Sequence, residues 1–599
     1  MAKGKESVFD IKLFKRLLHY IKPYRWVFIV SIIAVIGLAV FGAIRPKVLQ
    51  LAIDENINKR LLEGFIKYII IYIVLLVFEV ISNLVFIYFF SIMQSMRNLA
   101  TISFSVLIVS LLNSCLNSPT KGNKQLLIKT KILNATFSGF LDTEVAINDG
   151  EIINMANGEA SDEYADSILT GYAYPGFIDA HCHFVGYAKG LTEANLFATK
   201  SFEEVLERLV NFRTSNPNLE VIYGRGWDQN DWDIKSFPDN KELNAFFPDV
   251  PVILTRIDGH AVLANNKALE VFSINLETKV EGGVVEAKKG MLTGILIDHA
   301  AGLIEEKIDF DLLKSNLLTA EQNCFAVGLT TLDDAGLNLE MIQFLDSLQK
   351  SNELKIKLYI MASDNPENFN HFIENGPYTT ERMNIRSFKF YADGALGSRG
   401  ACLLHGYSDD KGNYGLMLNT EEHFRQSAEL LMKNGFQMNT HAIGDSANRL
   451  LLNVYKDVLK GKNDKRWRIE HAQIVSDSDM SLFEEYSVLP SVQPTHATSD
   501  MYWAEDRLGH EHIGDAYAYQ ELLDMSGVLP LGTDFPVEEI DPLKTFYAAV
   551  VRKDVGGYPE EGFQMENAIS RSNALKGMTL WAAYSNFEEN EKGSIEVGK

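Results

Sequence analysis

The sequence predicts an α/β fold: a (β/α)8 TIM barrel with a small β-sandwich domain, preceded by a transmembrane helical hairpin. Three observations favour this fold class. Two long apolar runs lie near the N-terminus, short β-rich runs follow within residues 126–154, and eight apolar β-rich runs alternate with helical patterns from Tyr174 onward. Strand-then-helix alternation is typical of a parallel sheet, and eight such units are typical of a closed barrel.

The two N-terminal apolar runs predict membrane-spanning helices. Residues 26–44 contain no charged side chain, and residues 68–93 contain only Glu79. Each run is long enough to cross a hydrocarbon core of about 30 Å. The lysine and arginine residues before the first run predict a cytoplasmic N-terminus. We therefore expect a helical hairpin in a cell membrane.

Residues 1–95, with the segments FKRLLHYIKPYRW and RPKVLQLAIDENI, resemble the start of the transmembrane domain of an ABC exporter. The resemblance implies a partial domain of two helices. ATP binding is not expected, because GSIEVGK at residues 593–599 lacks the Ser or Thr and the helix that follow in a phosphate-binding loop.

Residues 96–124 resemble a bacterial lipoprotein signal and a polar linker. Met96 begins a segment with one positive charge and an apolar stretch, and small polar residues precede Cys115. A third short membrane span is the alternative. Either interpretation places residues 116–599, with the catalytic domain, in an extracytoplasmic position. The whole chain as translated is expected to be a multi-pass protein. If translation starts at Met96, Cys115 is the expected lipid anchor, and membrane lipid is an expected partner.

The composition excludes several function classes. The chain has 56 Lys and Arg against 79 Asp and Glu, a formal net charge of −23, and nucleic-acid binding requires a basic face. Its four cysteines include no CxxC pair, which argues against a disulfide framework and a cysteine-rich zinc site.

The remaining chain divides into a small β domain and the barrel. We expect the β domain at residues 125–173, with Asp149-Gly150 as a hairpin turn. The barrel is expected at residues 174–585, with a long insertion at 184–327 after its first strand. Residues 586–599 are interpreted as a truncated return to the β domain.

Candidate reactive groups lie at the ends of the predicted barrel strands, where such barrels place their active sites. His181 and His183 are two residues apart, so both face the same side of a strand. If Phe388 and Phe390 pack against helices, Lys389 enters the barrel. Each group alone could be structural, but together they indicate a metal site at one barrel mouth. The six candidates are His181, His183, Lys389, His441, His471 and Asp534.

Residues 126–599 strongly resemble the metal-dependent amidohydrolase superfamily, specifically amidohydrolase family 3, which includes N-substituted formamide deformylases. The motifs include PGFIDAHCH, FKFYADGALGSRGA, THAIGDSAN, RIEHAQ and GTDFPVEEIDP. The resemblance implies two divalent metal ions, expected to be zinc. It also implies His181 and His183 on one ion, His441 and His471 on the other, and a carboxylated Lys389 that bridges both. Asp534 would bind a metal and act as the catalytic residue in proton transfer.

The activity implied is hydrolysis of a carbon–nitrogen bond other than a peptide bond, in a small-molecule amide substrate. Metal-activated hydroxide would attack the carbonyl, and Asp534 would pass a proton to the leaving nitrogen. A cyclic amide hydrolase or a deaminase-type amidohydrolase is an alternative. Another is a membrane transport subunit fused by accident to an inactive barrel, and a third is a metal-free relic that only binds a ligand.

Six further side chains are candidate substrate-binding groups, with structural hydrogen bonding an equally good interpretation. Four lie in the insertion expected to roof the barrel mouth, and two follow the seventh strand. They are Arg225, Trp227, Asp258, His260, His496 and Arg507. Asp179 and Glu470 are expected to hold the barrel and its ligands rather than to react.

Overall fold

The computed structural model describes residues 71, 72, 74, 125–134, 136–148, 150–157, 167–304 and 308–599. The chain divides into two units, residues 1–124 and 125–599. Apart from three residues of the second apolar run, the predicted hairpin, the ABC-exporter-like segment, the lipoprotein signal and Cys115 lie outside the described residues. Among the helices that the structure describes, none combines the length and the apolar character needed to cross a membrane.

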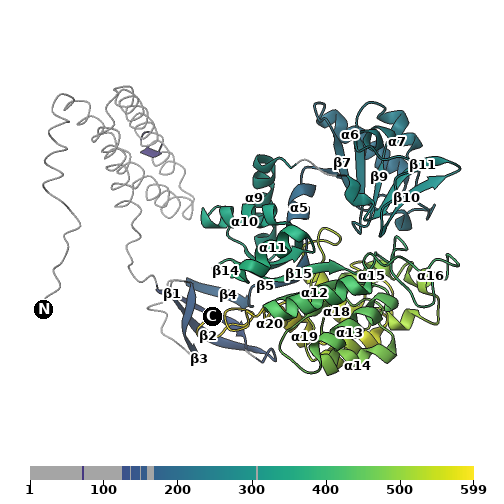
Figure 1. Cartoon of the computed structure of the whole chain (residues 1–599). Helices are drawn as coiled ribbons and strands as arrows, with labels where there is room; N and C mark the ends of the chain where they lie inside the picture. The colour runs from purple at the N-terminus through teal and green to yellow at the C-terminus, as the bar shows by residue number, and fades with distance from the viewer. Residues whose placement is uncertain are drawn as a thin grey trace. The chain divides into compact units, whose positions relative to one another are not determined.

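A four-stranded sheet opens the second unit (Figure 1). Its strands are β1 (Gln125–Leu133), β2 (Phe140–Asn148), β3 (Glu151–Asn157) and β4 (Ser167–Ala173), in the order β3-β2-β1-β4. Backbone hydrogen bonds of 2.8 Å join Ile152 of β3 to Gly598 and Lys599. The described residues form one mixed sheet here, not the two facing sheets of the expected β-sandwich, because they supply strands for only one layer.

A nearly closed parallel barrel follows. Its strands are β5 (Phe177–Cys182), β12 (Leu329–Leu337), β13 (Lys357–Ser363), β15 (Met383–Tyr391), β16 (Gln437–Ala442), β17 (Arg468–His471) and β18 (Leu489–Ser491). They pair in parallel in chain order, and the two-residue strand β14 (Tyr378–Thr379) adds antiparallel to β15. Seven of the eight predicted barrel runs are thus regular strands.

The eighth predicted strand is an irregular segment that closes the barrel. Leu531 forms an isolated parallel bridge with Val492, just after β18, and its carbonyl oxygen accepts a hydrogen bond from Ala180 of β5. The expectation of eight regular strands is corrected here. Val492 donates to the Pro530 carbonyl at 3.1 Å and Gly532 donates to the Val492 carbonyl at 3.1 Å, so the pairing of this segment with the barrel next to β18 is one bridge rather than a regular strand.

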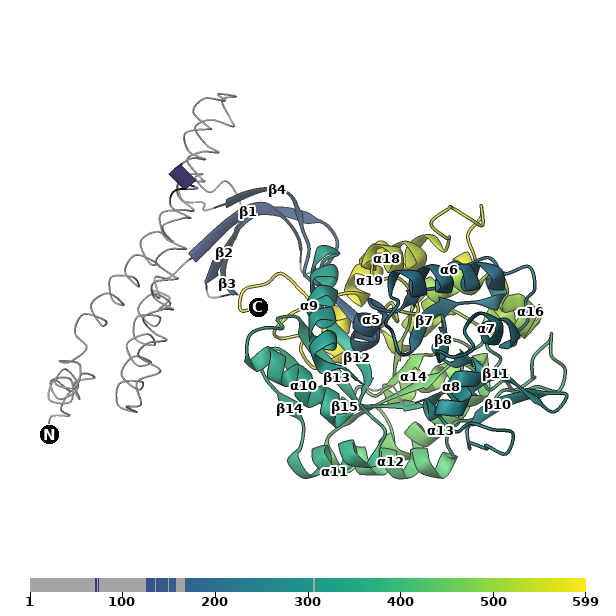
Figure 2. The ribbon, with the colours of Figure 1, turned by 90° about the horizontal axis from the view of Figure 1, so that it is seen from above.

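Helices cover the outside of the barrel, and α10 and α11 lie against the outer side of β13 and β15 (Figure 2). The helices are α5 (Phe184–Gly190), α9 (Phe310–Ala326), α10 (Leu339–Lys350), α11 (Pro366–Asn375), α12 (Glu421–Asn434), α13 (Asp445–Leu459), α14 (Asp477–Tyr486), α15 (Pro494–Asp500), α16 (Ala504–Leu508), α17 (Tyr519–Ser526), α18 (Pro542–Val551), α19 (Arg571–Gly577) and α20 (Leu580–Ser585). Six of these thirteen begin at a side chain that accepts a backbone hydrogen bond: Asn338 accepts from the backbone N–H of Met341 at the start of α10, for example.

The insertion after the first barrel strand has its own six-stranded sheet, ordered β10-β11-β9-β8-β7-β6 (Figure 1). Its elements are β6 (Ala194–Asn195), α6 (Phe202–Ser215), β7 (Ile222–Trp227), α7 (Lys241–Phe246), β8 (Val252–Arg256), β9 (Ala261–Ala264), α8 (Asn266–Val271), β10 (Gly283–Lys288) and β11 (Met291–Asp298). Buried apolar clusters on the sheet are separate from the barrel core.

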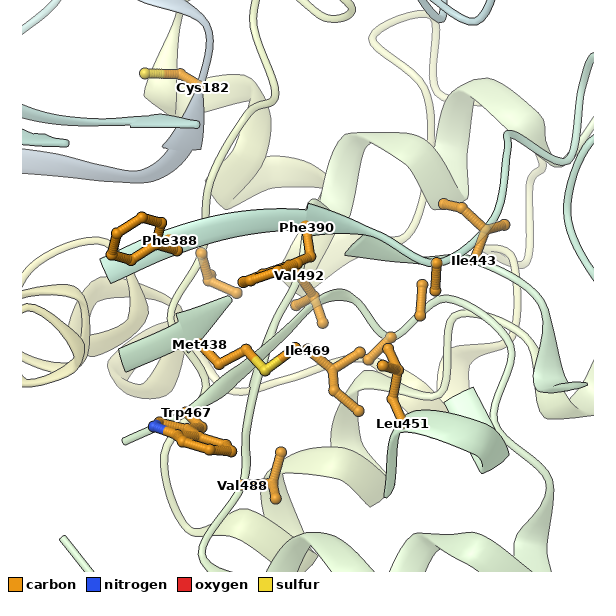
Figure 3. Packing of buried hydrophobic residues seen from close by; sticks show 14 of the residues in the cluster. Cys182, Phe388, Phe390, Met438, Ile443, Leu451, Trp467, Ile469, Val488 and Val492 are labelled. Carbon is orange, nitrogen blue, oxygen red and sulfur yellow. The ribbon is translucent and has the colours of Figure 1, made fainter. Parts of the chain in front are cut away.

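The barrel core lies between the strands and the surrounding helices. Phe388 and Phe390 are both fully buried in it (Figure 3). The ring of Phe369 from α11 stacks on Phe388 at 4.6 Å. Burying such a side chain contributes about 1.5–3 kcal/mol. The strand alternation predicted from this motif is confirmed, since Lys389 lines a cavity on the other face of β15.

Polar side chains fill the barrel interior near the N-terminal ends of the strands. Arg468 donates to Asp333 Oδ2 at 3.0 Å and to the Ala180 carbonyl at 3.1 Å, and Asn586 donates to Asp333 Oδ1 at 2.6 Å. This buried network closes the barrel at that end, so the other end is where a cavity can open.

Candidate metal centre

The strand ends bring the six predicted ligands to one mouth of the barrel. His181 and Cys182 are the last two residues of β5 and His183 follows the strand, while Cys182 is buried in the apolar core. Lys389 comes from β15, His441 from β16 and His471 from the last position of β17. Parallel strands have their carboxyl ends at one edge, so residues more than 350 positions apart meet there.

Asp534 completes this group from the irregular closing segment. Its Oδ1 atom lies 3.1 Å from His183 Nε2 and 3.6 Å from His181 Nε2. The backbone N–H of Asp534 donates to the His181 carbonyl at 2.8 Å, which fixes the carboxylate beside β5. Gly532 makes this approach possible, because a Cβ there would lie 2.5 Å from the backbone nitrogen of His181.

Hydrogen bonds to neighbouring side chains orient two of the imidazoles. His181 Nδ1 lies 2.6 Å from Glu470 Oε2, and His471 Nδ1 lies 2.6 Å from Gln493 Oε1. Each of these bonds holds Nδ1 and leaves Nε2 as the atom toward the mouth, where His181 Nε2 lies 3.3 Å from Lys389 Nζ. A ligating histidine in a metalloprotein is usually held in this way.

Several buried polar atoms in the cluster have no hydrogen-bond partner among the described residues. They include His441 Nε2, His496 Nε2 and Asp534 Oδ1. The ring centroids of His441 and His471 are 4.6 Å apart, and those of His181 and His471 are 4.8 Å apart. A buried polar atom without a hydrogen-bond partner costs free energy. The convergence of these atoms therefore fits a set of ligands for a cation. Two triads have donor atoms close enough for one ion each: His181, His183 and Asp534, and His471, His496 and Asp534.

The protonation of the cluster also suits metal binding. Burial is the largest cause that lowers the pKa of His181, to about 4, and burial likewise places the pKa of His441 and His471 well below the usual range. For Asp534, burial favours the acid, but the close contact with His183 and the charges of the nearby imidazoles outweigh it, and the pKa is lowered. Neutral imidazoles and an ionised carboxylate are the forms that bind metal ions.

Lys389 is 1% exposed and lies within this cluster. Its Nζ is 3.3 Å from His181 Nε2 and 4.8 Å from the ring centroid of Tyr391. Burial lowers the pKa of Lys389 to about 8, against the opposing charges of Glu470 and Asp534. Lys389 therefore has a substantial neutral amine fraction near physiological pH.

A cavity of about 580 Å³ opens at this mouth, between the barrel and the insertion. Four of the six predicted substrate-binding residues line it: Arg225, Asp258, His260 and His496. His260 Nδ1 lies 2.7 Å from Asp298 Oδ1, and its ring lies 5.1 Å from that of His441. Burial lowers the pKa of His260, but the bond and charge of Asp298 outweigh burial, so this pKa is raised.

The other two predicted substrate-binding residues do not line this cavity, which corrects the expectation for them. Trp227 is 1% exposed, donates to the Leu254 carbonyl at 2.9 Å and packs in the apolar core of the insertion. Arg507 pairs with Asp409 and donates to Asn230 at 2.7 Å, linking the barrel loops to the insertion. Both side chains satisfy structural contacts, the alternative that the sequence left open.

Some cavity and supporting residues were not predicted. Tyr391 lines the cavity two residues after Lys389, so strand alternation could have identified it. Gln493 lies in the same segment as His496, but its bond to His471 depends on the pairing of β17 and β18. Asp298, the partner of His260, ends β11, 38 residues away, and only the structure brings the pair together.

The model of the amidohydrolase family matches residues 171–599, well over half of the chain. The chain belongs to the amidohydrolase family. This amidohydrolase is therefore a hydrolase, and its barrel and cluster of metal-ligand residue types agree with that membership.

Proteins similar to this amidohydrolase are found in a plant, a bacterium and an archaeon. It is 28% identical to the protein LONG AFTER FAR-RED 3 of Arabidopsis thaliana, over 76% of this chain and 82% of that protein. It is 24% identical to the N-substituted formamide deformylase of Arthrobacter pascens, over 85% and 93% of the two chains. A crystal structure of a metal-dependent hydrolase from Pyrococcus horikoshii matches with a TM-score of 0.64 and 25% identity, over 79% and 95% of the chains.

Proposed function

We propose that this amidohydrolase is a metal-dependent hydrolase of non-peptide, amide-type C–N bonds in small molecules. One observation carries the proposal: the buried atoms His441 Nε2 and Asp534 Oδ1, which have no hydrogen-bond partner among the described residues, converge with the imidazoles of His181 and His471. The similarity to the formamide deformylase supports this bond class. The proposed ligands are the six strand-end residues, and the proposed ions are two zinc ions.

When bound, two divalent ions would supply an acidified water and polarise the carbonyl of the substrate. Asp534 Oδ1, 3.1 Å from His183 Nε2, is the carboxylate placed to accept a proton at this mouth and return it to the leaving nitrogen. Its lowered pKa keeps it ionised at neutral pH, the form that a base requires.

Lys389 is the proposed site of carboxylation. Its neutral amine can form an N–C bond with carbon dioxide and release one proton, which leaves a carbamate anion. This conversion replaces a buried cation by an anionic oxygen ligand, and burial of an unpaired ammonium is costly. The position of Lys389 between His181 and Tyr391 supports this role.

A substrate panel with metal analysis tests the function. The zinc-loaded protein is expected to release formate or another acid from linear N-substituted amides. Ammonia release from heterocycles, without acid from linear amides, would favour a deaminase instead. His441→Ala should lose both bound zinc and activity, whereas the exposed control His510→Ala should keep both. Full activity in His441→Ala would overturn the proposal.

A further inference from the structure

Arg225 is a charged side chain without a partner. It lines the cavity, it is half-buried, and its buried Nε–H donates to no partner within the described residues. Its guanidinium forms no hydrogen bond or ion pair there either. Arg256, also on the cavity wall, instead bonds Gln229 at 2.8 Å and pairs with Asp228 and Asp258.

A β-bulge directs Arg225 into the cavity. Strand alternation alone would place Arg225 and Trp227 on one face, but the register of β7 against β8 shifts between them. Gly226 adopts φ +102° at this point, and a Cβ there would lie 2.5 Å from the ring of Phe197. Trp227 consequently enters the insertion core while Arg225 faces the cavity.

The acidic groups near Arg225 are already engaged. The charges of Glu193, Asp534 and Asp258 act on it, in that order of size. Asp534 and Asp258 form no ion pair with it among the described residues, and Glu193 has an interaction of its own. Asp258 pairs with Arg256 and accepts from the backbone N–H of His260, and Asp534 contacts His183. An arginine stays protonated in proteins, so this guanidinium carries an unused positive charge beside the candidate metal centre.

We propose that Arg225 binds a carboxylate of the substrate, so that the natural substrates are amides with a free carboxylate beyond the scissile bond. This inference rests on the proposed amide hydrolysis. A guanidinium matches a carboxylate with two parallel N–H···O bonds. A dianionic phosphate or phosphonate fits less well, because one cation must then offset two charges among several acidic residues on the cavity wall.

Three substrates that differ only in one terminal group test the proposed contact between Arg225 and the substrate carboxylate. N-formylphenylalanine, its carboxamide and the corresponding phosphonate share one skeleton and one scissile bond. We expect the zinc-loaded protein to prefer the carboxylate over the carboxamide in kcat/KM by about tenfold to a hundredfold, as for one charge-assisted contact. Arg225→Gln should reduce this ratio to near one, and Arg225→Lys should keep part of it. Arg213→Gln, which loses only a bond to the Leu219 carbonyl, should keep the full ratio.

Calorimetric binding of the same three compounds separates the two hypotheses. Absence of formate release from all three substrates would contradict amide hydrolysis of this type. Tighter binding of the carboxylate than of the carboxamide, lost in Arg225→Gln, would still support the carboxylate site. An unchanged preference in a folded Arg225→Gln protein, or a stronger preference for the phosphonate, would overturn it. Zinc content and the melting temperature report whether each variant is folded.

Discussion

His181 Nδ1 lies 2.6 Å from Glu470 Oε2, and both side chains are completely buried. Glu470 and His471 are neighbours in β17, so alternation directs their side chains to different positions. One strand thus supplies a proposed ligand and the group that orients a proposed ligand on another strand. The burial of the pair makes its orientation sensitive to single substitutions.

Glu470→Gln should lower zinc affinity about 10- to 100-fold, the usual effect of losing a group that orients a metal ligand. An amide can still accept a hydrogen bond, but it no longer carries the charge that balances the imidazole. Competition against a chromogenic chelator measures the affinity. The matched control is Glu340→Gln, an exposed glutamate on α10, which should bind zinc like the wild type. Equal affinities for the two variants would show that Glu470 is not needed to orient His181.

Asp534→Asn should lower kcat about 10²- to 10⁴-fold, the range for loss of a general acid–base group. Zinc analysis of the same samples separates the two proposed roles of Asp534. A fall in kcat that only follows the fall in bound zinc would leave Asp534 as a ligand without a proton-transfer role. Asp231→Asn, on the cavity wall but partly exposed, should retain kcat.

Lys389 should incorporate carbon dioxide. Protein exchanged into buffer with ¹³C-labelled bicarbonate should show one carbamate resonance by NMR, and Lys389→Arg should lack it. Incorporation should rise with pH through about 8, because only the neutral amine reacts and burial lowers the pKa of Lys389 to about 8. A signal that survives in Lys389→Arg would assign the carbamate to another amine.

The buried ammonium also predicts a pH-dependent stability. In the metal-free protein without carbon dioxide, unfolded Lys389 binds a proton between pH 8 and 10.5 that the folded state does not bind. The free energy of unfolding should therefore rise with pH across this window. Below pH 8, Lys389→Met should be more stable than the wild type by about 2–3 kcal/mol, from the size of the pKa shift. Denaturant unfolding at several pH values measures both effects.

Lys456 is exposed on α13, and Lys456→Met serves as the control for that series. The slope of its unfolding free energy against pH should equal that of the wild type. An identical slope in Lys389→Met would mean that Lys389 does not cause the pH dependence.

Gly532→Ala should destabilise the barrel closure by about 1–3 kcal/mol, the usual cost of inserting a methyl group where backbone already lies. The added Cβ would meet the backbone nitrogen and oxygen of His181 at 2.5 and 2.8 Å. Thermal unfolding measures the loss, and zinc affinity should fall with it because the same contact positions Asp534. Gly514→Ala, where a Cβ would meet no atom within 4 Å, should melt like the wild type.

Much of the fold could be predicted because its signals are local. Alternation within β15 is sufficient to place Phe388 and Phe390 in the core and Lys389 in the mouth. Succession of strand and helix predicts a parallel barrel, and seven regular strands confirm it. The eighth differs because it pairs through a single bridge at Leu531. An apolar β-rich run looks the same in sequence whether it pairs regularly or through one bridge.

The proposed site was predictable in part for the same reason. Strand ends bring the six candidates together whatever their distance along the chain. The cavity wall was not predictable in this way, because Arg225 and Trp227 look equivalent in sequence until the bulge at Gly226 separates them. Partners such as Asp298 and Gln493 depend on contacts between strands, which no local pattern records.

The insertion has its own clusters of buried apolar residues, and these are distinct from the cluster around the barrel. Selection on a new compound can therefore reshape the wall that carries Arg225 while the scaffold of the reacting groups is left intact. Exchanging the insertion between relatives would therefore test whether substrate preference moves with this wall while the proposed metal ligands of the barrel stay in place.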